Sequence, residues 1–176
     1  MKKLSTLLLL FLLSLSSAFA TTLETIFEDN FYTLHVPNRC GQNILNFLKL
    51  AQKENIDLSR AEIVNVQNGW VEPQYVRNEG YSPKAPGPAG LTRAPGKRYY
   101  DFHVFLIHEN KVYDFDYGNR PVVHSLQTYL KKMWFTGKEG DRFLGASLYP
   151  AEDYLSGKPM PTQTKSTPLL QLLNRK

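Results

Sequence analysis

The clearest helical pattern in the chain begins at Cys40. Four apolar side chains recur at the i, i+3, i+4 and i+7 positions of one helix face: Ile44, Phe47, Leu48 and Ala51. Polar side chains fall mostly on the other face: Lys49, Gln52, Lys53 and Glu54. The preceding Pro37-Asn38-Arg39 is typical of a helix start, so we expect Asn38 to cap the helix and Cys40 to lie in its first turn.

A second helix is predicted for residues 124–135, which read HSLQTYLKKMWF. Its apolar positions with helical spacing are Leu126, Leu130 and Met133. Residues 21–35 are expected to form only a short lead-in to the first helix. The apolar anchors expected in that lead-in are Phe31, Tyr32 and Leu34.

Runs rich in aromatic and β-branched residues predict an antiparallel sheet beside these helices. The most regular runs, residues 99–107 and 112–117, flank a short polar break and predict a hairpin. Weaker strand signals lie at residues 61–66, with a partner at 70–76 after the Asn68-Gly69 turn, and at residues 143–148. Together these elements predict an α+β fold.

Two segments have a composition that does not predict a packed element. Residues 77–98 are rich in Gly, Pro, Lys and Arg, which indicates an exposed loop. Residues 159–176 are largely polar and rich in Pro and Thr, and we assign no element there. The remaining length is that of one domain with a workable core, and we expect a single domain over residues 21–176.

The start of the chain has the pattern of an export signal. Lys2 and Lys3 precede an apolar run over residues 7–13, and Ala18-Phe19-Ala20 has the small-x-small pattern that signal peptidases cut. The apolar run is shorter than the roughly 20 residues that a spanning helix needs, and no later run is longer. We therefore expect residues 1–20 to be removed and the protein to be periplasmic or secreted, without a membrane span.

Charge adds little to this picture. Removing Lys2 and Lys3 with the signal lowers the formal net charge from +5 to +3. The chain contains no Lys/Arg run of the kind that follows a phosphate backbone, so we expect no nucleic-acid partner. A mildly basic surface that keeps the protein soluble accounts for the charge.

The cysteine count bears more directly on function. Cys40 is the single cysteine, so it cannot form an internal disulfide, although small exported domains commonly use cysteines in pairs. It can be a small buried apolar side chain, one half of an intermolecular bridge, or a nucleophile. A helix start favours the last role, because free N–H groups and the helix dipole stabilise a thiolate and an oxyanion.

A general base for such a thiolate is expected at His103. This imidazole lies inside an apolar strand, where it needs a polar partner, and Asp114 and Asp116 both have the strand parity that faces it. Either acid can hold the ring in the required tautomer. The alternative is a core histidine satisfied by a neighbouring acid, without catalysis. A cysteine at a helix start with histidine and acid on the following sheet is the papain-type order of elements.

The other histidines are weaker candidates for the base. We expect His35, His108 and His124 to be surface or capping residues. The four histidines and the cysteine have no metal-ligand spacing, so we predict no metal and no cofactor.

Three motifs resemble those of the protein N-terminal glutamine amidohydrolases. They are Cys40-Gly41-Gln42-Asn43-Ile44, Tyr100-Asp101-Phe102-His103-Val104 and Val112-Tyr113-Asp114-Phe115-Asp116. The family has a Cys followed two and three residues later by Glu-Asn, then W-D-Y-H-V, then Y-D-L-D. The resemblance covers about residues 32–155, including a strand–turn–strand segment over residues 64–73 and a late stretch over residues 143–155.

The resemblance implies a papain-like fold, a reaction and a set of catalytic residues. It implies that Cys40 is the nucleophile, His103 the base and Asp114, rather than Asp116, the acid that orients the base. The family converts an N-terminal glutamine of a protein or peptide to glutamate and ammonia through an acyl-enzyme, without a cofactor. A side-chain amide needs the same nucleophile, base and oxyanion site as a peptide bond.

This chain departs from the family pattern where the substrate is expected to bind. Gln42 stands where the family has Glu, and Tyr100 stands where it has Trp. We expect Gln42, Tyr100 and Asp101 to contact substrate, with Asp101 the acid that remains for an α-ammonium group; a solvent-exposed strand acid is the alternative. The export signal also departs from the family's cytosolic role.

Two other functions stay open on the sequence alone. The first is a secreted deamidase of internal glutamines, or a papain-like cysteine peptidase, that uses the same three residues. The second is a non-catalytic binding module on the same fold, with residues 77–98 as its contact surface.

Overall fold

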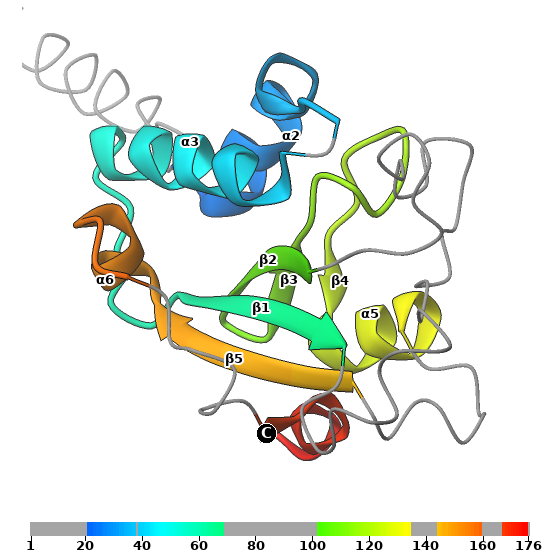
Figure 1. The fold of residues 1–176 in the computed structure, drawn as a ribbon. Helices are drawn as coiled ribbons and strands as arrows, with labels where there is room; N and C mark the ends of the chain where they lie inside the picture. The colour runs from blue at the N-terminus through cyan, green and yellow to red at the C-terminus, as the bar shows by residue number, and fades with distance from the viewer. Residues whose placement is uncertain (1–20, 38, 69–101, 135–143, 160–166, 176) are drawn as a thin grey trace, which may run out of the picture.

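The computed structural model describes residues 21–37, 39–68, 102–134, 144–159 and 167–175. Over these residues the protein is a mixed α+β structure in which helices pack on an antiparallel sheet (Figure 1). The sheet has six strands in the order β4-β3-β2-β1-β5-β6. None of the helices in these ranges is long and apolar enough to cross a membrane.

The elements follow one another as the sequence broadly predicts. The helices are α2 (Leu23–Leu34), α3 (Cys40–Lys53), α5 (Leu126–Met133), α6 (Ala151–Leu155) and the 3-10 helix η3 (Leu169–Asn174). The strands are β1 (Glu62–Asn68), β2 (Phe102–His108), β3 (Lys111–Tyr113), β4 (His124–Ser125), β5 (Leu144–Pro150) and β6 (Thr167–Pro168).

The helix predicted at Cys40 is confirmed. Helix α3 begins at Cys40, and its predicted apolar face is buried. Arg39 occupies the cap position and makes no side-chain hydrogen bond to the helix. The predicted cap, Asn38, lies outside the described residues. Cys40 is therefore the first residue of an amphipathic helix that buries its apolar face and exposes its polar face to water.

The hairpin is confirmed, although its second strand, β3, ends at Tyr113 rather than at 117, and its turn fixes the register. His108 pairs with Lys111, which leaves Glu109 and Asn110 as a two-residue turn. Both turn residues have positive φ, 50° and 61°, the pattern of a type I′ turn. This turn matches the twist of paired strands and places Leu106 opposite Tyr113. The neighbours of β1 are β2 and β5, and its expected partner at 70–76 lies outside the described residues.

The expectation of a lead-in over residues 21–35 is wrong. Helix α2 occupies most of this segment, and Thr22 caps it by accepting a hydrogen bond from the Thr25 N–H. Phe27 and Phe31 are buried one helical turn apart, whereas Tyr32, an expected anchor, is 71% exposed. The helix forms because its buried residues, Leu23, Ile26, Phe27 and Phe31, have helical spacing.

Two boundaries also differ from prediction. Helix α5 begins at Leu126 rather than 124, because His124 and Ser125 pair with β3 and the Ser125 side chain caps the helix. The segment after 159, left without elements, contains β6 and η3 within its described part. The strand predicted over residues 143–148 is β5, whose described residues run from Leu144 to Pro150.

The sheet separates two hydrophobic clusters. Val104 and Leu106 of β2 pack with residues of α2 and α3, whereas Phe105 and Ile107 pack with residues of α5 and η3. Side chains that alternate along a strand point to opposite faces, so β2 is covered on both sides. In Figure 1, α2 and α3 lie over one side of the sheet, and α5 lies beyond its other side.

Candidate active site

The side chains around Cys40 meet beside the first residues of β2, where β3 no longer pairs with that strand. Strand β3 pairs with β2 only from Leu106 to His108 and ends at Tyr113. His103, near the start of β2, therefore lies beyond the end of β3. The first turn of α3 and the chain after Tyr113 can both reach His103 there.

Side chains that follow β3 alternate between the hydrophobic core and the side of the sheet on which His103 lies. Phe115 packs against Phe27 and Phe31, with ring centroids 5.0 and 5.5 Å away. Asp114 and Asp116, on either side of it, are directed to the histidine side and are 2% and 4% exposed. An apolar residue between two acids thus anchors the segment and turns both carboxylates toward the cluster.

Asp114, rather than Asp116, is the acid that contacts His103. If the β2–β3 register continued, His103 would lie opposite Asp116. The chain leaves the strand at Tyr113, and Asp114 Oδ2 lies 3.0 Å from His103 Nε2. The backbone N–H of Asp116 donates to Asp114 Oδ1 at 2.9 Å, which fixes this turn.

Asp114 is also held from α5. The Tyr129 hydroxyl donates to Asp114 Oδ2 at 2.7 Å, and all of these groups are buried. Burial raises the pKa of Tyr129 well above its ordinary value, and the neighbouring Asp114 charge raises it further, so its hydroxyl keeps its proton. Sequence reasoning missed Tyr129, which appeared only as one position in a predicted helix.

His103 lies between Asp114 and Cys40. The Cys40 Sγ and a His103 ring nitrogen lie within 4.8 Å of each other. Because Nε2 engages Asp114, the buried Nδ1 is the nitrogen that can face the thiol. Burial disfavours the charged ring, but the Asp114 carboxylate and the Cys40 side chain, by charge and hydrogen bonding, together raise the pKa of His103 well above 6.5.

Asp116 completes a compact group around the thiol. One of its carboxylate oxygens lies within 4.8 Å of both the Cys40 Sγ and a His103 nitrogen. His35, at the end of α2, contacts Asp116 Oδ1 through Nε2 at 3.1 Å. Burial, and then the charge of Asp114, raises the pKa of Asp116. His35 was expected to be a surface or capping residue, yet the structure places it in this cluster.

The first turn of α3 is fixed by two polar side chains. Asn43 is fully buried; its Nδ2 donates to the Val36 carbonyl at 2.9 Å, and its Oδ1 accepts from the Val36 N–H. The Tyr154 hydroxyl donates to the Gly41 carbonyl at 3.0 Å. Burial raises the pKa of Tyr154, and the nearby Cys40 raises it further. These contacts hold Cys40 at the start of the helix.

The predicted substrate-contact residues are placed differently. Gln42 is exposed on α3, and its side-chain amide donates to Asn46 Oδ1 at 2.8 Å. Tyr100, Asp101, the loop at 77–98 and the export signal at 1–20 lie outside the described residues. The structure therefore brings together Cys40, His103 and Asp114 and does not bring Gln42 into their contacts.

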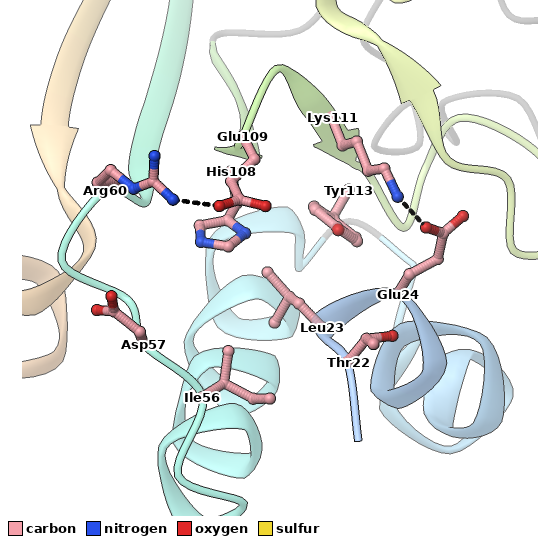
Figure 2. A pocket seen from close by; sticks show the side chains of 10 residues that line it. All are labelled: Thr22, Leu23, Glu24, Ile56, Asp57, Arg60, His108, Glu109, Lys111 and Tyr113. Carbon is pink, nitrogen blue, oxygen red and sulfur yellow. Dashed lines mark hydrogen bonds and ion pairs between the residues drawn. The ribbon is translucent and has the colours of Figure 1, made fainter. Parts of the chain in front are cut away.

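A separate hollow of about 310 Å³ lies at the other end of β2, beside the hairpin turn (Figure 2). Its polar groups pair with one another: Arg60 with Glu109, and Lys111 with Glu24. His108, at the end of β2, also lines it. Among the described residues that line this hollow, none belongs to the Cys40 cluster.

Chemically, the cluster contains the parts of an acyl-transfer site. It has a thiol, an imidazole within reach of it, and a carboxylate that fixes the imidazole, which are the three roles of a catalytic triad. The backbone N–H groups at the start of α3 can also stabilise negative charge near Cys40.

Comparison with known proteins does not add to this geometry. No protein-family model matches the chain, and no curated protein matches it. The function is therefore argued from the residues of the site.

Proposed function

We propose that the protein is an exported glutamine amidohydrolase of papain-like fold, with Cys40 as nucleophile, His103 as base and Asp114 as orienting acid. The observation that carries the proposal is the buried contact of His103 with Asp114 beside the thiol of a helix-start cysteine. The order of helix cysteine, strand histidine and then an acid directly after the next strand supports the papain-like assignment.

The reaction begins with a proton shared between Cys40 and His103. The raised pKa of His103 favours the imidazolium, and in the proposed mechanism His103 takes the proton of the Cys40 thiol. The thiolate adds to the side-chain carbonyl carbon of glutamine, and N–H groups at the start of α3 donate hydrogen bonds to the oxyanion that forms. His103 then gives its proton to the departing nitrogen, so ammonia leaves and a thioester remains on Cys40.

Water completes the cycle at the same residues. His103, now neutral, takes a proton from a water molecule that adds to the thioester. Collapse of this second tetrahedral intermediate breaks the carbon–sulfur bond, releases glutamate and leaves the Cys40 thiolate beside the protonated His103. Asp114 keeps its contact with Nε2 throughout, so the ring presents Nδ1 to the thiol in both steps.

N-terminal glutamine of a protein or peptide is the leading substrate. The three motifs that resemble N-terminal glutamine amidohydrolases support this choice, and each contains one of the three proposed catalytic residues, Cys40, His103 and Asp114. Asp101 is the acid proposed for the substrate's α-ammonium group, since Gln42 carries no charge. The signal-like residues 1–20 support export, so the enzyme would meet its substrate in the periplasm or the medium.

A peptide panel tests the reaction. Wild-type protein is incubated with peptides that carry glutamine at the N-terminus, at an internal position, or at an N-acetylated first position. We expect ammonia release and conversion to glutamate with an intact backbone, fastest for the free N-terminal glutamine. Cys40→Ala is the matched control and is expected to lose at least about a thousandfold in rate.

The same panel decides between the proposal and its rivals. Backbone cleavage products dependent on Cys40 identify a cysteine peptidase, and faster turnover of internal glutamine identifies a deamidase of folded or internal sites. If no peptide is processed above the Cys40→Ala rate, the reaction is wrong and the fold serves a binding role.

A further inference from the structure

The thiol of Cys40 has two other potential metal ligands beside it. Its Sγ, a ring nitrogen of His103 and a carboxylate oxygen of Asp116 all lie within 4.8 Å of one another. Sulfur, imidazole nitrogen and carboxylate oxygen are the ligand atoms that Zn²⁺ takes in proteins. The ligands come from three separate elements, so no spacing in the sequence indicates them.

The distances between the three ligand atoms are already close to those in a zinc site. With Zn–S of about 2.3 Å and Zn–N and Zn–O of about 2.0–2.2 Å, tetrahedral ligand atoms lie roughly 3.3–3.6 Å apart. Since the ligand atoms lie within 4.8 Å of one another, each pair needs to close by about 1.5 Å at most. Cys40 is half-buried as a residue.

The surroundings of the ligands are those of a metal site. His103 directs Nε2 to Asp114 at 3.0 Å, and a carboxylate on the second ring nitrogen is the usual partner of a zinc-bound histidine. Tyr129 holds that carboxylate in turn at 2.7 Å. His35 at 3.1 Å orients Asp116 in the same way. Both nonsulfur ligands are therefore preset by their own neighbours.

We propose that Cys40, His103 and Asp116 form a reversible Zn²⁺ site, with a fourth position left to solvent. Zn²⁺ there occupies the nucleophile and the base together, so it switches off the amide hydrolysis proposed above. Metal binding stands on the ligand geometry alone, whereas inhibition rests on the proposed function.

Zn²⁺ binding is tested on chelator-treated protein that comprises residues 21–176. Calorimetric titration with ZnCl₂ is expected to give one site per chain, and Co²⁺ is expected to give the thiolate-to-metal charge-transfer absorption of a sulfur ligand. Zn²⁺ is also expected to slow alkylation of Cys40 by iodoacetamide at least about tenfold, because the bound sulfur is no longer nucleophilic.

Variants separate this site from adventitious binding. Asp116→Asn is expected to weaken Zn²⁺ at least about tenfold, while Asp29→Asn, an exposed acid on α2, leaves the affinity unchanged. Far-UV circular dichroism verifies the fold of each variant. Cys40→Ala provides a second test, because the Co²⁺-loaded variant should lose the sulfur-to-metal absorption. Equal Zn²⁺ affinity in wild type, Asp116→Asn and Cys40→Ala overturns the site.

The assay with glutamine peptides reports separately on the two proposals. Loss of activity on adding Zn²⁺, with recovery on adding chelator, supports inhibition at this site. If the chelator-treated protein is inactive and Zn²⁺ restores it, the inhibitory role is wrong and so is the metal-free thiol mechanism. Absence of Zn²⁺ binding overturns the metal site and leaves the hydrolase proposal standing.

Discussion

At the scale of single residues, the two acids after β3 have different roles. Asp114 accepts from His103, Tyr129 and the backbone N–H of Asp116, whereas Asp116 contacts His35. Asp114→Asn replaces the acceptor at Nε2 by an amide and disturbs the tautomer of His103. We expect kcat to fall by about 10²–10⁴.

Asp116→Asn is the comparison for that variant. It removes one charge near the thiol without breaking the contact between Asp114 and His103, so a smaller loss of kcat is expected. Steady-state ammonia release from a glutamine peptide measures both. Equal losses, or a larger loss for Asp116→Asn, would contradict the assignment of Asp114 as the orienting acid.

Tyr129 offers a prediction about stability. Its hydroxyl donates to a buried carboxylate at 2.7 Å, and Tyr129→Phe leaves that acceptor with one donor fewer. We expect the free energy of unfolding to fall by about 1.5–3 kcal/mol, measured by urea denaturation near neutral pH. Tyr113→Phe is the matched control, since its ring is also in the core, and a smaller loss is expected for it.

The sequence could predict the residue types of this site but not all of its contacts. Cys40 stood out as a single cysteine at a helix start, and His103 stood out with the two acids because a polar group in an apolar strand needs a partner. The choice of Asp114 could not follow from strand parity, since both acids share it; it depends on the chain leaving β3 at Tyr113. His35 and Tyr129 were missed because each reaches the cluster from a distant element.

At the scale of elements, the hairpin turn places His103. Glu109 and Asn110 both have positive φ, and a glutamate in this conformation is strained because its Cβ crowds the backbone. Type I′ turns favour Asn-Gly at these positions. The turn is therefore a weak point that a substitution can improve without touching the cluster.

We predict that Glu109→Asn combined with Asn110→Gly raises the free energy of unfolding by about 1 kcal/mol. The lost ion pair between Glu109 and Arg60 is exposed and offsets little of this gain. Denaturant unfolding measures the change, and the peptide assay should show unaltered turnover. A loss of stability would contradict the type I′ assignment.

Strong periodicity explains which elements the sequence could predict. Helix α3 and the β2–β3 hairpin have regular patterns and were predicted, including the start at Cys40. Helix α2 was missed although its buried residues have helical spacing, because Tyr32, which lies on its exposed face, was taken as an apolar anchor. Elements β4 and β6 are two residues long each, too short to show any period.

At the scale of the whole molecule, α2 links the core to the site. Phe27 is fully buried and contacts Phe31, Phe47, Tyr113 and Phe115 with ring centroids 5.0–5.5 Å away. Among these, Phe115 lies between the two acids of the cluster. Packing around Phe27 therefore stabilises the fold and positions the segment after β3.

Phe27→Ala is expected to lower the free energy of unfolding by about 3–5 kcal/mol, since it leaves a large cavity among these rings. Urea denaturation measures the loss. Tyr32→Ala, on the same helix but 71% exposed, is the control and should change stability by less than about 0.5 kcal/mol. A similar loss for both would mean that α2 does not pack as described.

The order of strands could not be predicted from the sequence. The sheet brings β5 beside β1 across a long stretch of chain, and such pairing depends on tertiary packing rather than on local pattern. On the β3 side, His103 lies beyond the paired stretch, because β3 is shorter than β2 and pairs with it only from Leu106 to His108. The site is thus a property of the complete sheet.

The central claim is that His103 activates the thiol of Cys40. The pKa of His103 is raised well above 6.5, so the ring is protonated at pH 6 and remains so until the pH rises through the raised value. A protonated imidazole stabilises a thiolate beside it, and only the thiolate reacts with iodoacetamide. Alkylation therefore tests the pair without any knowledge of the substrate.

The decisive measurement is the rate of Cys40 alkylation by iodoacetamide at pH 6 in wild type and in His103→Gln, followed by intact mass. His108→Gln is the matched control, because His108 lines the separate hollow and is not part of the Cys40 cluster. The account predicts that His103→Gln reacts at least about tenfold more slowly than both other proteins. Equal rates in all three would contradict a thiolate activated by His103.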